Sequence, residues 1–354
     1  MNETIYFFTK YSRLGASSRY RTFQYLSTLP SNVDYEVHPL FNDGYIEALY
    51  QNNAKPIFKA LLSYIKRFFL LLKCKSNSTL VLENELWPYL PFFIEKLFLK
   101  RFNRLVLIYD DAIFHHYDLS NNFYLKLNKK KIGELIGLSS CTIAGNKYLE
   151  SYALTYNKPV TVIPTVIDIK KYKLQEKLEP TQNEKLQLVW LGSPSTARYL
   201  YLLKDVFENP LVRENCQLII IGTSNIHIDG LDTTYLDWSE ETEINNIQKC
   251  DVGIMPLNDD PWSRGKCGFK LIQYMAAGLP CIASPVGINK EIITDGVTGF
   301  LADGAPEWVD SIKTFLNDRN LIKQLGKAGR DKIEKFYTID ATKEQWLDSI
   351  IGKT

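Results

Sequence analysis

Several common signatures are missing from this 354-residue chain. Its six cysteines are scattered without a CxxC pair, which argues against a zinc site or a disulfide framework and favours reduced core thiols in a cytoplasmic protein. No run of about 18 uncharged apolar residues occurs, so we expect no membrane-spanning helix. The opening MNETIYFFTK has an early acid and no basic region, so we expect no signal peptide.

Acidic residues are scarce in the first half of the chain. Residues 1–160 carry 20 Lys and Arg against 13 Asp and Glu, a net charge of +7, whereas the remainder carries 22 against 27, a net charge of −5. Residues 56–75 contain no acid, and residues 92–104 again combine bases with aromatics. Such segments are typical of helices that bind an anionic membrane surface, and the alternative is a core helix with a basic rim. No basic stripe interleaved with base-stacking aromatics is present, so we expect no nucleic-acid partner.

Continuous apolar runs recur along the chain with helical stretches between them, a pattern typical of parallel strands buried on both faces. Two series of runs are separated by the polar segment 170–185. They predict an α/β protein with two Rossmann-like, doubly wound domains that face each other across a cleft, residues 1–169 and 186–337. The runs are Ile5–Thr9, Tyr35–Leu40, Thr79–Leu82, Leu105–Tyr109, Cys141–Ala144 and Val160–Pro164, then Leu186–Leu191, Gln217–Ile221, Val252–Pro256 and Cys281–Ser284.

The most informative stretch is residues 264–300, RGKCGFKLIQYMAAGLPCIASPVGINKEIITDGVTGF. Residues 269–277 read as a helix, and the spacing i, i+4, i+7 places Lys266, Lys270 and Gln273 on one face. Two lysines near a helix start repel each other and oppose the helix dipole, and a bound anion would reverse both effects. A diphosphate fits this pattern, while the alternative is two solvated lysines with their stems on the surface.

Two further loops follow predicted strands. GSPST at 192–196 exposes N–H groups that suit phosphate oxygens, with Ser195 or Thr196 as a helix N-cap. SRLGASSRYR at 12–21 leads into a helix that we expect to reach about Leu29. In this loop a glycine permits close backbone approach, either serine can cap the helix, and two arginines can bind anions. The candidate residues are Gly15, Ser17, Ser18, Arg19 and Arg21.

Asp110 and Asp111 close another predicted strand and precede His115. Polar groups at the carboxyl ends of parallel strands border the ligand crevice of such sheets. An acidic pair can act as a general base or bind a metal, and we interpret His115 as a surface histidine. There is no GxSxG elbow, so nothing points to a serine nucleophile of that kind.

The chain resembles glycosyltransferase family 4. The parts that carry the resemblance are Gly268, MAAG at 275–278, CIASPVG at 281–287, Glu291 and DGVTG at 295–299. It extends to GASSRYRTFQYL at 15–26, YDDAIF at 109–114, AGNKYLESYA at 144–153, WLGSPSTARYL at 190–200 and CDVGIMPLNDDPWSRGKCGFK at 250–270. The resemblance implies the GT-B fold, with an acceptor domain, a nucleotide-sugar donor domain, and a C-terminal helix within residues 338–354 that crosses back to the first domain.

The resemblance also implies roles for residues. Donor binding falls to Gly192, Ser193, Lys266, Gly268, Lys270 and Gln273, and acceptor contact falls to Asp110 or Asp111. One departure concerns two glutamates that many members carry with seven residues between them. The matching positions here hold Gly265 and Gln273. Gln273 can still bind a ribose hydroxyl, but Gly265 cannot contact the sugar, and Asp259, Asp260 or Arg264 are candidates to replace that contact.

The activity implied is transfer with retention from a nucleotide sugar to a lipid-linked or polysaccharide acceptor in bacterial surface-glycan synthesis. The leaving diphosphate would accept the acceptor's proton, and Lys266 and Lys270 would stabilise its charge. No metal or other cofactor is expected, and the location implied is the cytoplasmic face of the inner membrane. The alternatives are a catalytically silent nucleotide-binding subunit of a polysaccharide assembly complex, which the loss at Gly265 motivates, and a GT-B sugar-nucleotide epimerase.

Overall fold

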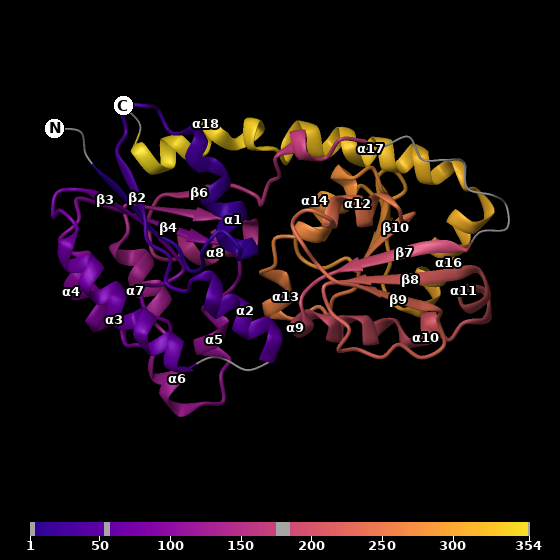
Figure 1. Ribbon diagram of the computed structural model, residues 1–354, viewed down its shortest axis with the longest axis horizontal. Helices are drawn as coiled ribbons and strands as arrows, with labels where there is room; N and C mark the ends of the chain where they lie inside the picture. Colours follow the sequence, from indigo (N-terminus) through magenta and orange to yellow (C-terminus); the bar gives the residue numbers. More distant parts are fainter. Residues whose placement is uncertain (1–3, 53–56, 175–184, 353–354) are drawn as a thin grey trace. The chain divides into compact units, whose positions relative to one another are not determined.

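The computed structural model describes residues 4–52, 57–174 and 185–352 (Figure 1). The chain divides into two compact units. Unit 1 comprises residues 1–166, 265–267 and 342–354, and unit 2 comprises residues 167–264 and 268–341. The segment predicted as a linker, 170–185, therefore lies near the start of unit 2, and its residues 175–184 are outside the described part of the chain.

Unit 1 is built on a sheet of six parallel strands in the order β2-β1-β3-β4-β5-β6. All residues of β1, β3 and β5 are buried, as expected for parallel strands covered on both faces. The edge strand β2 differs from its predicted run, because it is only three residues long and two of them are exposed. The strands are β1 (Ile5–Phe8), β2 (Tyr35–Val37), β3 (Thr79–Glu83), β4 (Arg104–Tyr109), β5 (Cys141–Ala144) and β6 (Val160–Val162).

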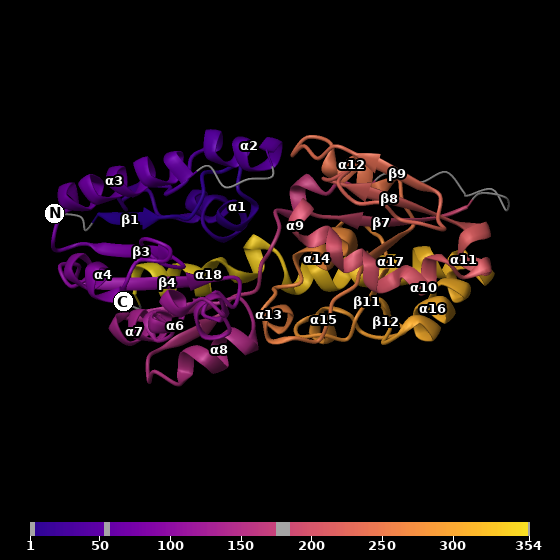
Figure 2. The ribbon, with the colours of Figure 1, turned by 90° about the horizontal axis from the view of Figure 1, so that it is seen from below.

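Helices cover both faces of this sheet (Figures 1 and 2). On one face Tyr6 and Phe8 share a core with Leu71 of α3 and Leu99 of α4. On the other face Trp346 of α18 stacks on Tyr25, with ring centroids 4.9 Å apart. The helices are α1 (Ala16–Arg21), α2 (Asp43–Asn52), α3 (Ile57–Lys73), α4 (Phe92–Leu99), α5 (His115–Asp118), α6 (Phe123–Leu127), α7 (Lys131–Leu138), α8 (Lys147–Leu154), the 3₁₀ helix η1 (Phe23–Thr28), and α18 (Ile339–Ile351) from Thr342 onward.

Unit 2 contains a second sheet of six parallel strands, in the order β12-β11-β10-β7-β8-β9. Two of these strands, β9 and β12, were not among the predicted runs. Both are short and mostly half-buried, so they lack the continuous apolar character that marks the central strands. The strands are β7 (Leu186–Leu191), β8 (Cys216–Ile221), β9 (Thr233–Leu236), β10 (Val252–Met255), β11 (Cys281–Ala283) and β12 (Gly299–Leu301).

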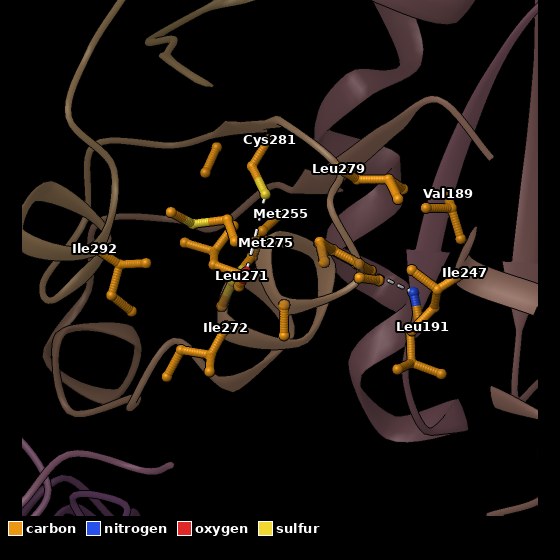
Figure 3. Close-up of a cluster of buried hydrophobic side chains, with 14 of the residues drawn as sticks. Val189, Leu191, Ile247, Met255, Leu271, Ile272, Met275, Leu279, Cys281 and Ile292 are labelled. Carbon is orange, nitrogen blue, oxygen red and sulfur yellow. Dashed lines mark hydrogen bonds between the residues drawn. The ribbon is translucent and has the colours of Figure 1, made fainter. Parts of the chain in front are cut away.

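The core of unit 2 lies on both faces of its sheet. Figure 3 shows one of the two clusters, in which Leu271 and Met275 of α14 pack with residues of β7, β10 and β11. The tyrosine of α14, Tyr274, accepts a hydrogen bond from the Leu191 N–H at 2.7 Å and thereby fixes α14 to the end of β7. The helices are η2 (Ile169–Lys171), α9 (Pro194–Ala197), η3 (Arg198–Leu203), α10 (Lys204–Phe207), α11 (Pro210–Asn215), α12 (Glu243–Gln248), α13 (Pro261–Arg264), α14 (Phe269–Ala276), α15 (Asn289–Ile292), α16 (Ala305–Asn317) and α17 (Asn320–Phe336).

All six cysteines are buried and free. None of the helices in the described parts of the chain has both the length and the apolar character that a membrane crossing requires.

Candidate functional site

Strand order locates the candidate sites in each unit. A doubly wound sheet binds ligands beyond the carboxyl ends of its strands, at the point where the strand order changes direction. In unit 1 this point lies between β1 and β3, and in unit 2 it lies between β7 and β10. The loops that follow these strands should therefore carry the chemistry, and most of the candidates from the sequence lie in or beside them.

Asp110 and Asp111 follow β4 at the carboxyl edge of unit 1, as predicted. The Ser17 hydroxyl of α1 donates a hydrogen bond to Asp110. The segment 12–21, called the glycine loop below, is therefore in direct contact with the acidic pair. Burial, and then the neighbouring Asp110 carboxylate, raise the pKa of Asp111 to about 6, against the opposing charges of Lys266 and Lys10. Asp111 is thus a carboxyl that changes charge near neutral pH, as a general base must.

Glu83, the last residue of β3, was not singled out in the sequence. Its buried carboxylate accepts hydrogen bonds from the Lys10 N–H at 2.9 Å and from the hydroxyls of Ser18 and Thr22, both at 2.5 Å. Burial raises the pKa of Glu83, and these hydrogen bonds oppose that rise. Glu83 therefore anchors the start of α1, whose Ser17 holds Asp110. The signal available in the sequence was an acid at the end of a predicted parallel strand.

The serines and arginines of the glycine loop have different roles from those predicted. The N-cap position of α1 is Gly15, without a side-chain cap, so neither Ser17 nor Ser18 caps the helix. Arg21 is buried and donates to the Ile163 carbonyl at 2.6 Å and to the Cys267 sulfur at 3.1 Å. Arg19 is also buried, and its guanidinium lies 4.9 Å from the Tyr20 ring centroid. Both arginines are thus buried against protein groups, and anion binding by either of them stays a prediction.

The short segment 265–267 belongs to unit 1, although the residues on either side of it belong to unit 2. The Asn146 side-chain amide donates to the carbonyls of Gly265, at 3.0 Å, and Lys266, at 2.9 Å. The Cys267 thiol donates to the Asp110 carbonyl at 2.9 Å, and burial raises its pKa to about 12. Neither Asn146 nor Cys267 was predicted as a site residue. The sequence offered one signal, an asparagine in a helix-capping position directly after a predicted strand.

The predicted helix face of Lys266, Lys270 and Gln273 is wrong for Lys266. Helix α14 starts at Phe269, and its N-cap Gly268 has a left-handed backbone, with φ +64°. Lys266 therefore lies before the helix, in unit 1, where its charge lowers the pKa of Asp111. A β-carbon at position 268 would also lie 2.3 Å from Ile292, so this cap requires glycine for both its conformation and its space.

In unit 2 the loop after β7 lies beside Lys270. The Lys270 ammonium is 5.3 Å from the centroid of the Trp190 ring, and a β-carbon at Gly192 would lie 2.5 Å from that same ring. Helix α9 starts after Ser193, without a side-chain cap, which corrects the expectation of an N-cap at Ser195 or Thr196. Gly192, Ser193 and Lys270 therefore meet around Trp190 at the carboxyl end of β7.

Gln273 is buried and takes part in a polar network that the sequence did not reveal. Its amide nitrogen donates to the Glu243 carboxylate at 3.2 Å, and the Trp238 indole N–H donates to the other oxygen of that carboxylate at 2.5 Å. Glu243 is buried as well. The carboxylate of Glu243 thus stands beside Gln273, the residue that replaces the glutamate implied by the family resemblance.

The remaining candidates have protein partners. Arg264 pairs with Asp259, with N–O distances of 2.6 and 3.0 Å, and Asp260 accepts the Ser263 N–H at 2.7 Å. His115 is not a surface histidine, because its side chain is only 10% exposed and its ring contacts Asp118 and the Tyr148 hydroxyl. Within the described residues no group of three or more His, Cys, Asp or Glu is arranged to hold a metal ion.

Comparison with known proteins adds a family and a fold. Residues 185–318 match the family model described as Glycosyl transferases group 1. The sulfoquinovosyl transferase of Arabidopsis thaliana is 24% identical over 179 residues, 47% of this chain and 34% of that protein. The Escherichia coli UDP-Gal:alpha-D-GlcNAc-diphosphoundecaprenol alpha-1,3-galactosyltransferase is 22% identical over 225 residues, 55% of each chain. The chain spans about a third or less of the first curated relatives that it matches.

The solved structure of Anabaena HepE in complex with UDP-glucose is similar over 99% of this chain and 100% of that one, with a TM-score of 0.68 and 13% identity. Two doubly wound parallel sheets together with this likeness define the protein as a member of the GT-B fold class, as predicted. Residues 185–318, the main part of unit 2, are similar to the glycosyl transferases of group 1. The predicted resemblance to glycosyltransferases is confirmed at this level.

Proposed function

We propose that the protein transfers a sugar, with retention of configuration, from a nucleotide-sugar donor to a lipid-linked or polysaccharide acceptor in bacterial surface-glycan synthesis. The observation that carries the proposal is the match of residues 185–318 to group 1 glycosyl transferases. The Escherichia coli relative is named for a donor that is a nucleotide sugar and an acceptor that is a lipid diphosphate. HepE was solved with UDP-glucose, and both names support a donor of this class.

The donor diphosphate would bind in unit 2, at the carboxyl end of β7. The Gly192 N–H already donates to the Ile221 carbonyl at 3.0 Å, so the Ser193 N–H and the ammonium of Lys270 would supply the complementary charge. A phosphate needs close approach to the backbone, and the absence of a side chain at Gly192 provides it. Gln273 and Glu243 would bind the nucleoside, with the Glu243 carboxylate accepting hydrogen bonds from hydroxyl groups.

The acceptor would bind in unit 1, at the carboxyl edge where Asp110, Asp111 and Lys266 lie. Asp111, whose pKa is raised to about 6, is half charged near that pH and can accept a hydrogen bond from an incoming hydroxyl. In the retaining reaction the leaving diphosphate accepts the hydroxyl proton, and Lys270 stabilises the negative charge that develops on it. No metal or other cofactor forms part of this proposal.

We also propose that the protein works at the cytoplasmic face of the inner membrane, through residues 56–75 and 92–104. Helix α3 is strongly amphipathic and contains no acidic residue. Its side chains Ile57, Phe58 and Leu61 are more than half exposed. Such a face favours the interface of an anionic bilayer. A lipid-linked acceptor would be met at the same surface.

Calorimetric titration with nucleoside diphosphates and their sugars tests the donor site without knowledge of the acceptor. Wild type would be compared with Lys270→Ala, with Lys266→Ala, and with Lys313→Ala as a control on an exposed lysine. We expect one nucleotide to bind and Lys270→Ala to weaken it by about tenfold or more, as for a lost charge-assisted contact. Equal affinities for Lys270→Ala and Lys313→Ala would refute the site.

One observation favours a second candidate, the catalytically silent binding subunit. Gly265 stands where many relatives carry a glutamate, and its surroundings leave no room for a side chain. Nucleotide binding in the titration, with no turnover on lipid or polysaccharide acceptors and no slow hydrolysis of the donor, would support that candidate. Detectable turnover would eliminate it.

A further inference from the structure

A second exposed apolar surface lies in the connection between β4 and α7. Helix α6 leaves Phe123 76%, Leu127 68% and Tyr124 46% exposed, and Leu119 just before it is 57% exposed. Soluble proteins expose single apolar side chains often, but a cluster of four on about ten residues marks an interaction site. This segment lies outside the two basic, aromatic stretches that the sequence predicts to bind a membrane, residues 56–75 and 92–104.

Helix α6 is held in place by a side-chain cap at its start and by one core contact. The Asn122 side chain caps it by accepting the N–H groups of Tyr124, at 2.9 Å, and Leu125, at 3.3 Å. Leu125 turns inward and packs on the core of unit 1. With Leu125 fixed inside, the helix presents Phe123 and Leu127 outward, so their exposure is built into the fold.

The charge of this segment matches that of α3. Residues 119–130 contain Lys126, Lys129 and Lys130, all exposed, and no acid. Helix α3 also lacks acids and exposes its apolar side chains beside lysines. Figure 1 shows α3 and α6 on the same lower side of unit 1, and Figure 2, seen from below, shows them separated from each other across that side.

We propose that α6 is a second membrane-binding element, which enters the interface of an anionic bilayer while α3 binds the same bilayer some distance away. The inference rests on the membrane contact proposed above and adds to it a second contact and thus an orientation. Two separated contacts define a plane for unit 1, whereas a single helix leaves the unit free to rotate about that helix.

The charges favour a bilayer over a second copy of the chain. Two copies that met through this surface would bring like-charged lysines together, which opposes association. The centre of a protein–protein interface is also depleted of lysine. Lysines beside exposed aromatic and leucine side chains instead suit the boundary between anionic headgroups and acyl chains.

The position of α6 in the chain gives the contact a consequence for the acceptor. Residues 112–122, which include the short helix α5, connect Asp110 and Asp111 at the carboxyl edge of the sheet to α6. A bilayer contact at α6 therefore holds the acidic pair close to the membrane surface, where the polar head of a lipid-linked acceptor is found. A soluble polysaccharide acceptor has no need of this arrangement.

Sedimentation with vesicles tests the proposal, using the whole chain and equal parts of phosphatidylglycerol and phosphatidylcholine, or phosphatidylcholine alone. The α6 variant is Phe123→Ser with Leu127→Ser, and the α3 variant is Phe58→Ser with Leu62→Ser. The matched control, Tyr201→Ser with Leu202→Ser, removes two exposed apolar side chains from unit 2. We expect each of the first two variants to lower the partition coefficient by about tenfold or more, and the control to remain at the wild-type value.

A second measurement does not depend on the folding of the serine variants. Tryptophan placed by Phe123→Trp should be quenched by brominated lipids, and tryptophan placed by Tyr201→Trp should not, each relative to the wild-type signal. If the α3 variant is released while the α6 variant binds fully and Phe123→Trp is not quenched, this inference fails and the contact through α3 stands. If wild type does not bind anionic vesicles, the contacts through α3 and α6 are both refuted. If wild type forms dimers that the α6 variant abolishes, the α6 surface binds a second copy instead.

Discussion

Gly265 packs against Ala112 so closely that a β-carbon at position 265 would lie 2.4 Å from the Ala112 β-carbon and 2.9 Å from the Ala112 backbone nitrogen. Asn146 holds this segment in place through the Gly265 carbonyl. Glycine at 265 is therefore a packing requirement of unit 1, and the glutamate that the family resemblance implies at this position cannot be introduced here without displacing the backbone.

Gly265→Ala should destabilise the protein by about 1–3 kcal/mol, the usual cost of overpacking a core position. Ala112→Gly in the same chain should recover part of that loss, because it removes the nearer of the two clashing atoms. Urea unfolding of the single and double variants measures both effects. Gly137→Ala is the control, since nothing lies within 4 Å of its position and alanine improves an exposed helix site by up to about 1 kcal/mol. Equal stabilities for the variants at positions 265 and 137 would contradict the packing argument.

The central strands and the two doubly wound sheets could be predicted because they depend on local composition, whereas the GT-B fold was implied by the family resemblance. Runs such as Leu186–Leu191 and Cys141–Ala144 are continuous and apolar, and they form β7 and β5. The edge strands could not be predicted in the same way, because β9 and β12 are half-buried and their stability comes from pairing with neighbours distant in sequence. Helix α14 was recognisable from its periodicity and its glycine boundaries.

The candidate site was predictable only in part, for a related reason. Strand ends place Asp110 and Gly192 correctly, because the carboxyl edge of a parallel sheet is implied by the strands themselves. Helical spacing misled us at Lys266, since the left-handed Gly268 ends the periodicity before it. Partners such as Glu83 for Ser18, and Glu243 for Gln273, are 65 and 30 residues apart, and no local pattern connects them.

Asp111 should make the stability of the protein depend on pH in a defined window. Its pKa is raised from an ordinary 3.8 to about 6, so the folded state holds the proton more tightly than the unfolded state. The stability that the protonated form contributes is present below pH 4 and is lost as pH rises through 6. Asp111→Asn cannot ionise and should gain on wild type across that window by about 3 kcal/mol, with no further change above pH 7.

Urea unfolding of wild type and Asp111→Asn between pH 4 and 8 measures this gain. The exposed Asp303→Asn variant controls for the loss of one carboxylate from the chain. A difference between wild type and Asp111→Asn that does not vary with pH would mean that the carboxyl titrates in its ordinary range. If Asp111 also binds the acceptor as a carboxylate, turnover should fall below pH 6 in wild type.

Glu83→Gln should loosen the glycine loop and the start of α1. Glutamine offers one acceptor oxygen in place of two and turns an amide donor toward hydroxyls that already donate, so we expect a loss of about 1–3 kcal/mol. Hydrogen exchange should accelerate at the Lys10 amide, which donates to Glu83, and at the Tyr11 amide, which donates to Ser18. The exposed Glu47→Gln is the control.

Thr22→Val separates this role from a general loss of stability. The Thr22 hydroxyl donates to the same carboxylate, so the effects of Glu83→Gln and Thr22→Val should be less than additive in the double variant. Full additivity, or unchanged exchange at Lys10 and Tyr11, would show that Glu83 does not anchor the loop.

Exchanging the side chains of Gln273 and Glu243 provides the sharpest test of the buried network in unit 2. In wild type the Gln273 amide nitrogen donates to the Glu243 carboxylate at 3.2 Å. Gln273→Glu alone replaces that donor with a second buried carboxylate at about the same place. An uncompensated buried charge of this kind costs about 3–5 kcal/mol, and the loss should diminish at low pH as one carboxylate takes up a proton. Adding Glu243→Gln restores the pairing, because the new amide can donate to residue 273 and its oxygen can still accept the Trp238 N–H.

We therefore expect the double exchange to recover most of the stability lost in Gln273→Glu, which a double-mutant cycle of unfolding free energies measures. The exchange also moves the carboxylate to residue 273, where the family resemblance implies a glutamate. If the network binds the nucleoside of the donor, the exchanged protein should bind the nucleotide as well as wild type does, and Glu243→Gln alone should bind it less tightly. Wild type and the double exchange each keep one carboxylate in the network. Recovered stability without recovered nucleotide binding would therefore show that the network serves only the fold.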